Sequence, residues 1–111
     1  MKTVFVLGTE YEIMTDVPEE GMPENADGAC DVTTKTIWIA KLEVDRNSVK
    51  NMDSYKKKVI RHEIVHAFLY ESGIADCSMD CDSWATNEEM VDWFAIQAPK
   101  IIEAFKVADC L

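Results

Sequence analysis

The sequence has little basic charge and no long apolar run. It holds 11 Lys and Arg against 21 Asp and Glu, which gives a net charge of −10 over 111 residues. Proteins bind nucleic acids and anionic membranes through clustered Lys and Arg, so neither is expected as a partner. The apolar runs are far shorter than the roughly 20 residues of a membrane-spanning helix. We expect a metal ion, a small molecule or a protein as the partner instead.

An export signal is also missing. Val4 begins a short apolar run, but Gly8 and Glu10 end it well before it reaches the length of a signal sequence. The four cysteines are therefore interpreted as reduced thiols, and we expect a cytoplasmic protein. Because 48% of the residues are hydrophobic, the chain can bury one core, and residues 1–111 are expected to form a single domain.

The N-terminal part of the chain predicts strands. Three runs are rich in β-branched and aromatic residues: 4–7, 10–14 and 36–40. Gly8 lies between the first two runs and can supply the positive φ that a hairpin turn needs. Residues 18–28, which hold Pro, Gly and several carboxylates, predict an exposed loop, and residues 29–33 predict a brief strand.

A long helix is predicted next, with Asp53 as its N-cap and Gly73 just beyond its end. Its apolar residues lie nearly all round the helix, so we expect it to run through the middle of the domain. The basic residues near its start are interpreted as a solvated surface. They are Lys56, Lys57, Lys58 and Arg61.

A second helix is predicted after a loop at residues 74–85. Thr86 and Glu89 fit a capping box, with Thr86 as the N-cap. The helix should run towards Ala108, with a kink or a restart at Pro99.

The first of these helices carries an H-E-x-x-H motif at residues 62–66. Positions four apart lie on one face of a helix, so both imidazoles can reach one ion at the roughly 2.0–2.1 Å of a Zn–N bond. Glu63 lies beside that line and can act as general base, because zinc lowers the pKa of water and polarises a carbonyl group. His62 and His66 are the only histidines in the sequence. The motif therefore predicts a Zn²⁺ site.

A third ligand must come from a carboxylate or a thiol, because no histidine remains. On the second helix, Glu88 borders the apolar side and Glu89 points away from it, so helix geometry favours Glu88 as the ligand. Asp92 lies one turn later and can accept the free ring N–H of a liganding histidine. The spacing of Cys77 and Cys81 is too weak a pattern to predict a second zinc site.

Together the two motifs resemble those of gluzincin metallopeptidases. The pattern H-E-x-x-H at residues 62–66, followed by N-E-x-x-x-D at residues 87–92, is similar to the zinc sites of that class. Residues 61–69 and 90–95 look similar to the short ImmA/IrrE-like peptidases of phages and mobile elements. This resemblance implies a zinc-dependent peptidase that hydrolyses peptide bonds in a peptide or protein substrate.

The resemblance also implies an α+β fold. A small twisted, mostly antiparallel sheet would pack on an active-site helix, and a C-terminal helix would deliver the glutamate, forming a minimal zincin-like core. The strand at residues 36–40 would be the edge to which a peptide substrate adds. Gluzincins often place a histidine or tyrosine to stabilise the oxyanion. The candidates left open here are Tyr70, Tyr55, Tyr11 and Arg61.

Two other interpretations remain open at the level of sequence. One is a non-catalytic, zinc-stabilised binding module that keeps the ligands without turnover. The other is a metal-free α+β interaction domain.

Overall fold

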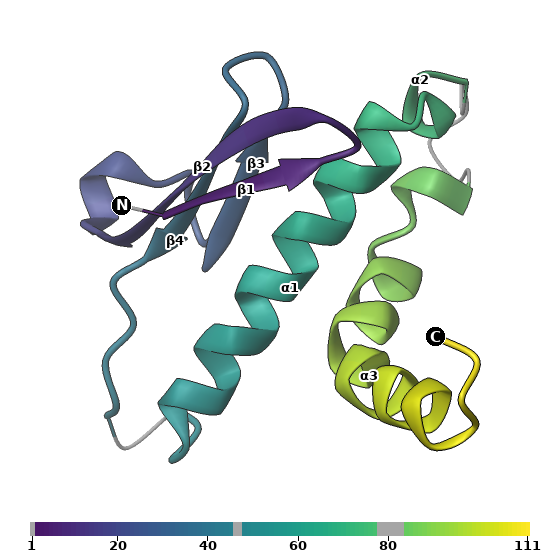
Figure 1. The fold of residues 1–111 in the computed structure, drawn as a ribbon. Coiled ribbons are helices and arrows are strands. Elements are labelled where there is room, and N and C mark those ends of the chain that lie inside the picture. Colours follow the sequence, from purple (N-terminus) through teal and green to yellow (C-terminus); the bar gives the residue numbers. More distant parts are fainter. Residues whose placement is uncertain (1, 46–47, 78–83) are drawn as a thin grey trace.

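The protein has an α+β fold in which a four-stranded sheet packs against a long central helix. The computed structural model describes residues 2–45, 48–77 and 84–111. Figure 1 shows helix α1 (Met52–Glu71) lying diagonally between the sheet on one side and helix α3 (Glu88–Val107) on the other. The predicted fold class is thus confirmed.

The predicted hairpin is present at the N-terminus. Strands β1 (Lys2–Val6) and β2 (Thr9–Val17) pair antiparallel, with Val6 opposite Thr9. Leu7 and Gly8 form the turn, with φ of 49° and 87°, and two successive positive φ values are the mark of a type I′ turn. Alternate residues of β2, Tyr11 and Ile13, are buried.

The sheet has the strand order β1-β2-β4-β3. Strand β4 (Thr36–Ala40) pairs parallel with β2 and antiparallel with β3 (Gly28–Asp31), while a short 3-10 helix, η1 (Glu19–Gly21), lies between β2 and β3. The prediction that residues 36–40 form an edge is therefore wrong, because β4 has a neighbour on each side. Burial explains its apolar sequence, since Ile37 and Ile39 are fully buried. The edges of the sheet are β1 and β3.

Helix α1 occupies the middle of the fold, as its distribution of apolar residues predicts. Val59 and Ala67 are buried in the core with residues of β1, β2 and β4. The predicted N-cap is wrong: the Asn51 side chain, not that of Asp53, accepts a hydrogen bond from the backbone N–H of Ser54 at 3.1 Å. Gly73, with φ of 87°, follows the last turn as expected.

The segment predicted as a loop, 74–85, contains short helical turns. They are α2 (Ile74–Cys77) and the 3-10 helix η2 (Trp84–Thr86), and residues 78–83 lie outside the described part of the chain.

The N-cap of helix α3 lies one residue later than predicted. Asn87 is the N-cap, because its side chain accepts a hydrogen bond from the backbone N–H of Met90 at 2.8 Å. The predicted capping box of Thr86 and Glu89 is therefore wrong, since Thr86 belongs to η2. Pro99 does not restart the helix, which continues through it. Figure 1 shows the axis of α3 bending in its C-terminal half.

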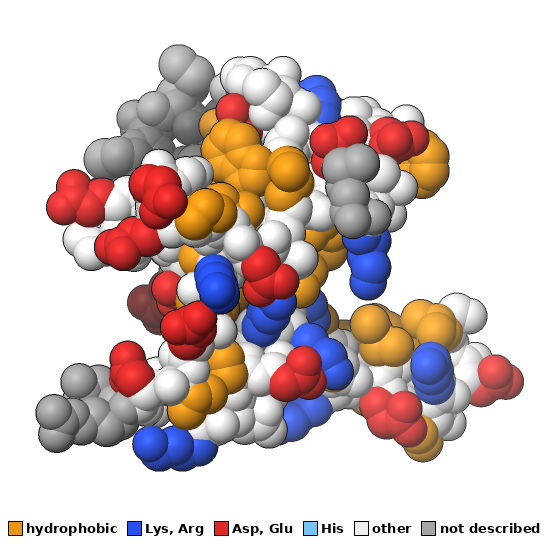
Figure 2. Space-filling model, turned by 90° about the vertical axis from the view of Figure 1, so that its left-hand side faces the viewer, with side chains coloured by type: hydrophobic (Ala, Val, Ile, Leu, Met, Phe, Trp, Pro, Cys, Tyr) orange, Lys and Arg blue, Asp and Glu red, His pale blue; other side chains and the backbone are white. Residues whose placement is uncertain are grey.

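None of the helices in the described ranges is both long and apolar enough to cross a membrane. The net negative charge is visible at the surface. Figure 2 shows red carboxylate side chains spread over one face and not gathered into a single patch.

Candidate metal centre

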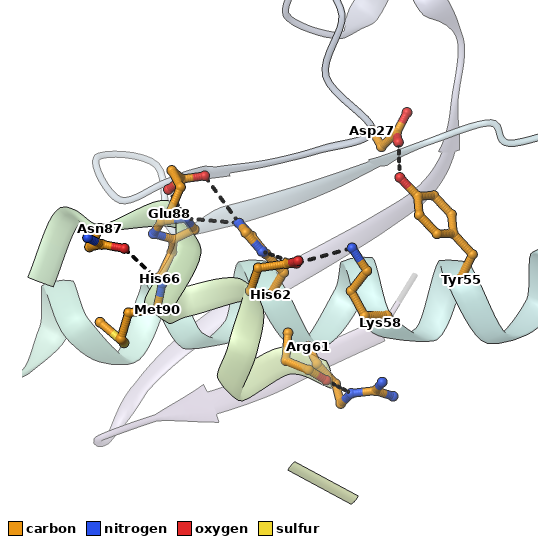
Figure 3. Close-up of polar contacts among 11 residues, drawn as sticks. Asp27, Tyr55, Lys58, Arg61, His62, His66, Asn87, Glu88 and Met90 are labelled. Carbon is orange, nitrogen blue, oxygen red and sulfur yellow. Dashed lines mark hydrogen bonds and ion pairs between the residues drawn. The ribbon is translucent and has the colours of Figure 1, made fainter. Parts of the chain in front are cut away.

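Three side chains meet where the start of α3 faces the middle of α1. His62 and His66 lie one turn apart on α1, with their Nε2 atoms 3.2 Å apart. Glu88, the first residue of α3, places its Oε1 2.7 Å from His66 Nε2 and its Oε2 3.4 Å from His62 Nε2. Figure 3 shows the Glu88 side chain reaching from α3 towards both rings. One ligand atom from each residue lies within 4.8 Å of the other two.

These three donors fit a zinc ion. Corners of a tetrahedron with bonds of about 2.05 Å lie about 3.3 Å apart. The two Nε2 atoms are 3.2 Å apart and Glu88 Oε2 lies 3.4 Å from His62 Nε2, and both separations are close to that value. The other carboxylate oxygen, Glu88 Oε1, accepts a hydrogen bond from His66 Nε2 at 2.7 Å. Burial, with His62 nearby, lowers the pKa of His66 despite the opposing Glu88 charge. The ring is then neutral at pH 7, which is the form that binds metal.

The structure brings together the ligand set that the sequence predicts and separates it from Glu89. Glu88 is an exposed side chain in contact with both imidazoles, whereas Glu89 is exposed without such a contact among the described residues. The difference follows from position on the helix, because Glu88 lies on the side of α3 that contacts α1 and the next residue is rotated by about 100° from it.

Asp92 lies where the sequence places it, behind His62. Its Oδ1 is 3.1 Å from His62 Nδ1 and also 3.1 Å from Lys58 Nζ. Burial favours a higher pKa for Asp92, but hydrogen bonds from Lys58 and His62 outweigh burial and lower it. The ionised carboxylate therefore holds the proton of His62 on Nδ1 and leaves the lone pair of Nε2 facing Glu88 and His66.

Glu63 lies beside the three donors, and its side chain is largely buried. It is 7% exposed, and none of the described residues donates a hydrogen bond to its carboxylate. Burial, opposed by the His62 charge and assisted by that of Glu88, raises the pKa of Glu63 to about 7. A carboxylate with such a pKa can both accept and return a proton near neutral pH.

Gly28 is a site residue that sequence reasoning missed. A Cβ at this position would lie 2.8 Å from Val59 Cγ1 and 2.9 Å from Glu63 Oε2. Only glycine lets β3 pass so close to the Glu63 side chain. The available signal was a glycine directly ahead of a short strand, which often marks close approach of the backbone.

Glu63 lines two cavities. One, of about 270 Å³, is lined by Gly28, Tyr55, His62 and Glu88 among others. The other, of about 170 Å³, is lined by Cys30, Glu63, His66 and Tyr70. The pKa of the Cys30 thiol is raised to about 12, first by burial and then by the charge of Glu63, so it stays protonated.

Two of the four candidate oxyanion residues lie at these cavities, Tyr55 and Tyr70. The Tyr11 hydroxyl instead donates to Glu71 at 2.6 Å on the far end of α1. The Arg61 guanidinium donates through Nε to the backbone carbonyl of Ala95 on α3. Tyr55 donates to Asp27.

The basic start of α1 is only partly solvated, which corrects the sequence interpretation. Lys56 pairs with Asp16 at 3.3 Å and Lys57 with Asp53 at 3.2 Å. Lys58 and Arg61 instead contact α3. The pattern of Cys77 and Cys81 extends beyond the described residues, because Cys81 lies outside them.

Two helices and the edge of a sheet thus place three metal donors beside a buried carboxylate and two cavities. A search against protein-family models, curated proteins and solved structures gives no match to this chain.

Proposed function

We propose that this protein is a zinc-dependent peptidase in which His62, His66 and Glu88 bind Zn²⁺ and Glu63 is the general base. The observation that carries the proposal is the convergence of the three donors within 4.8 Å, beside a carboxylate that is 7% exposed. Burial raises the pKa of this carboxylate to about 7, and perturbed pKa values of this kind are common at functional sites.

In the proposed reaction, three residues of the chain would act together with the zinc ion. When bound, zinc would polarise the carbonyl group of the substrate and lower the pKa of water. Glu63 would take the proton from the attacking water and pass it to the leaving amine, a transfer suited to its pKa of about 7. Asp92 would orient the His62 ring, and Gly28 leaves room for the Glu63 carboxylate.

Strand β3 supplies an edge for an extended peptide. The Ala40 N–H donates to the Asp27 carbonyl at 2.9 Å, so Asp27 faces β4. The backbone N–H and C=O groups of successive residues in an antiparallel strand point alternately to its two sides. Those of Gly28 and Cys30 therefore point away from β4, towards the open edge. Gly28 lies close to the Glu63 carboxylate, and Cys30 lines a cavity with Glu63 and His66. A peptide paired with β3 would pass along the proposed site.

A reducing compartment fits the cysteines. Cys30 and Cys110 are free thiols, which supports the proposal that the protein acts in the cytoplasm.

A zinc-stabilised binding module is the second candidate, because Glu88 also joins α3 to α1 through both histidines. Glu63→Gln separates the two candidates. In a peptidase, this substitution should leave zinc bound and lower cleavage of a peptide library by about 10²–10⁴-fold. A wild-type protein that binds zinc and cleaves nothing would favour the module.

The metal itself is tested by content after dialysis against metal-free buffer. We expect one equivalent of zinc, and less than about half an equivalent would overturn both candidates. Glu88→Ala should weaken zinc binding by more than about tenfold, whereas the matched Glu89→Ala should leave it unchanged. The reverse order would show that Glu88 is not the ligand.

A further inference from the structure

We propose that Arg61 is a positioning residue. It fixes α3 against α1 by donating a hydrogen bond to the Ala95 carbonyl, which has no partner within its own helix because residue 99 is a proline. In doing so it would hold Glu88 beside His62 and His66. The part of this inference that concerns zinc rests on the proposed function.

The free carbonyl follows from the position of the proline. In an α-helix the N–H of each residue donates to the carbonyl four residues earlier, so residue 99 would serve Ala95. Proline has no N–H, and its ring presses on that carbonyl. Ala95 is fully buried, so its carbonyl needs a partner from the protein. Arg61 Nε donates to it, as the dashed line from Arg61 in Figure 3 shows.

This contact is the last of a row that links the two helices. Helices α1 and α3 run antiparallel. Glu88 contacts His66 and His62. Further along α3, Asp92 contacts His62 and Lys58, and Ala95 contacts Arg61. Ala95 lies two turns after Glu88, about 10 Å along the axis. A slip of one turn, about 5.4 Å, would remove Glu88 from both imidazoles.

Arg61 differs from the other members of the row because its partner is backbone. The contact therefore sets the position of α3 along α1 without requiring a particular side chain at residue 95, but it does require the proline at residue 99. Arg61 and Pro99 should thus behave as one unit, although neither is a metal ligand or contacts Glu63 among the described residues.

A double-mutant cycle tests this dependence. Arg61→Met removes the donor while keeping most of the side chain's volume, and Pro99→Ala restores an N–H to the Ala95 carbonyl. Zinc affinity is measured by competition with a chromophoric chelator. Arg61→Met should lower the affinity by about tenfold or more in the wild-type background but by less than about threefold in the Pro99→Ala background, because the carbonyl then has a partner within its helix. Pro99→Ala alone should also lower the affinity, because the Ala95 carbonyl would then accept a hydrogen bond within α3 and would no longer hold Arg61.

An equal loss in both backgrounds would overturn the proposal. If Arg61→Met fails to fold alone but folds together with Pro99→Ala, the coupling is supported. The absorption spectrum of the Co²⁺-loaded protein should change with Arg61→Met alone, because Glu88 would shift at the metal; an unchanged spectrum with unchanged affinity would show a purely structural role and contradict positioning.

The same cycle is measured by urea unfolding in the presence of a chelator. There Arg61→Met should lower the unfolding midpoint more in the wild-type background than in the Pro99→Ala background. If the protein binds no zinc, the proposed function fails, yet this metal-free cycle still decides whether Arg61 and Pro99 act together. If the decreases in midpoint caused by the two substitutions simply add in the double variant, the coupling is overturned, even in a protein that binds zinc.

Discussion

Two glutamates of α1 lie two turns apart and have opposite surroundings. Glu71 accepts hydrogen bonds from Lys35 Nζ at 2.7 Å, Tyr11 OH at 2.6 Å and Thr9 Oγ1 at 3.1 Å, and these lower its pKa. Glu63 is buried, has no donor among the described residues, and its pKa is raised to about 7.

The two carboxylates differ in burial and in hydrogen-bond donors: Glu71 is partly buried and has three donors, whereas Glu63 is buried and has none among the described residues. Glu71 fastens the end of α1 to the sheet, and burial together with its charge raises the pKa of Tyr11, so that hydroxyl remains a donor. Glu63 makes no such connection, and its position is unfavourable for stability. The number of hydrogen-bond donors to the carboxylate therefore differs between these two positions of α1.

Replacing Glu63 should have the largest effect on stability. Without metal, its pKa rises from the ordinary 4.5 to about 7 on folding, so the folded state binds the proton more tightly. The contribution of Glu63 to stability should be constant below pH 4.5, fall as the pH rises to about 7, and remain low above it. At about 1.4 kcal/mol per pKa unit the change is about 3 kcal/mol. Glu63→Gln should abolish this slope in urea unfolding with chelator; a slope that persists would show that another group causes it.

Gly28→Ala should be next in size. The added methyl group would press on Val59 and on the Glu63 carboxylate, and we expect a loss of about 1–3 kcal/mol in the free energy of unfolding. Gly21→Ala is the matched control, because its Cβ would meet only Val17 Cγ1, at 3.1 Å. Equal losses in the two variants would mean that the close approach of β3 to Glu63 is unimportant.

At the other end of α1, Tyr11→Phe should cost about 1 kcal/mol, since it removes one donor from Glu71 while keeping the buried ring. Tyr70→Phe removes a hydroxyl that makes no hydrogen bond to the described residues, so the stability of that variant should be unchanged. Thermal unfolding of the two variants at pH 7 measures the difference.

The charge of Glu71 should contribute least, because Lys35 is 41% exposed and water screens the ion pair, and Glu71→Gln removes this charge. The lowered pKa of Glu71 means that its contribution is present above pH 4.5 and is lost as the pH falls through the folded-state pKa. Wild type and variant should therefore differ slightly in midpoint at pH 7 and converge in acid. A difference that grows in acid would contradict this assignment.

Local patterns of the sequence predicted which side chains lie together at the candidate site. Histidines four apart on a helix must share a face, and the apolar side of the second helix distinguishes Glu88 from Glu89. The structure brings His62, His66 and Glu88 together. The turn at Gly8 and the end of α1 at Gly73 also follow from local backbone requirements.

Contacts between distant segments could not be predicted in this way. Gly28 meets Glu63, and Arg61 meets Ala95, only after the sheet and α3 have packed on α1. The strand order is equally non-local, which is why β4 was mistaken for an edge. The caps failed for another reason: Asn51 lies close to Asp53, as Asn87 does to Thr86, and all four residues are good N-caps.

Strand β3 has a further consequence, for self-association. An open edge beside a binding site is also a template on which another copy of the same chain could add a strand. This edge is only four residues long and ends at Asp31, and a short strand with a terminal charge offers few hydrogen bonds to a second sheet. The open edge of β3 should therefore give the protein little tendency to polymerise through it.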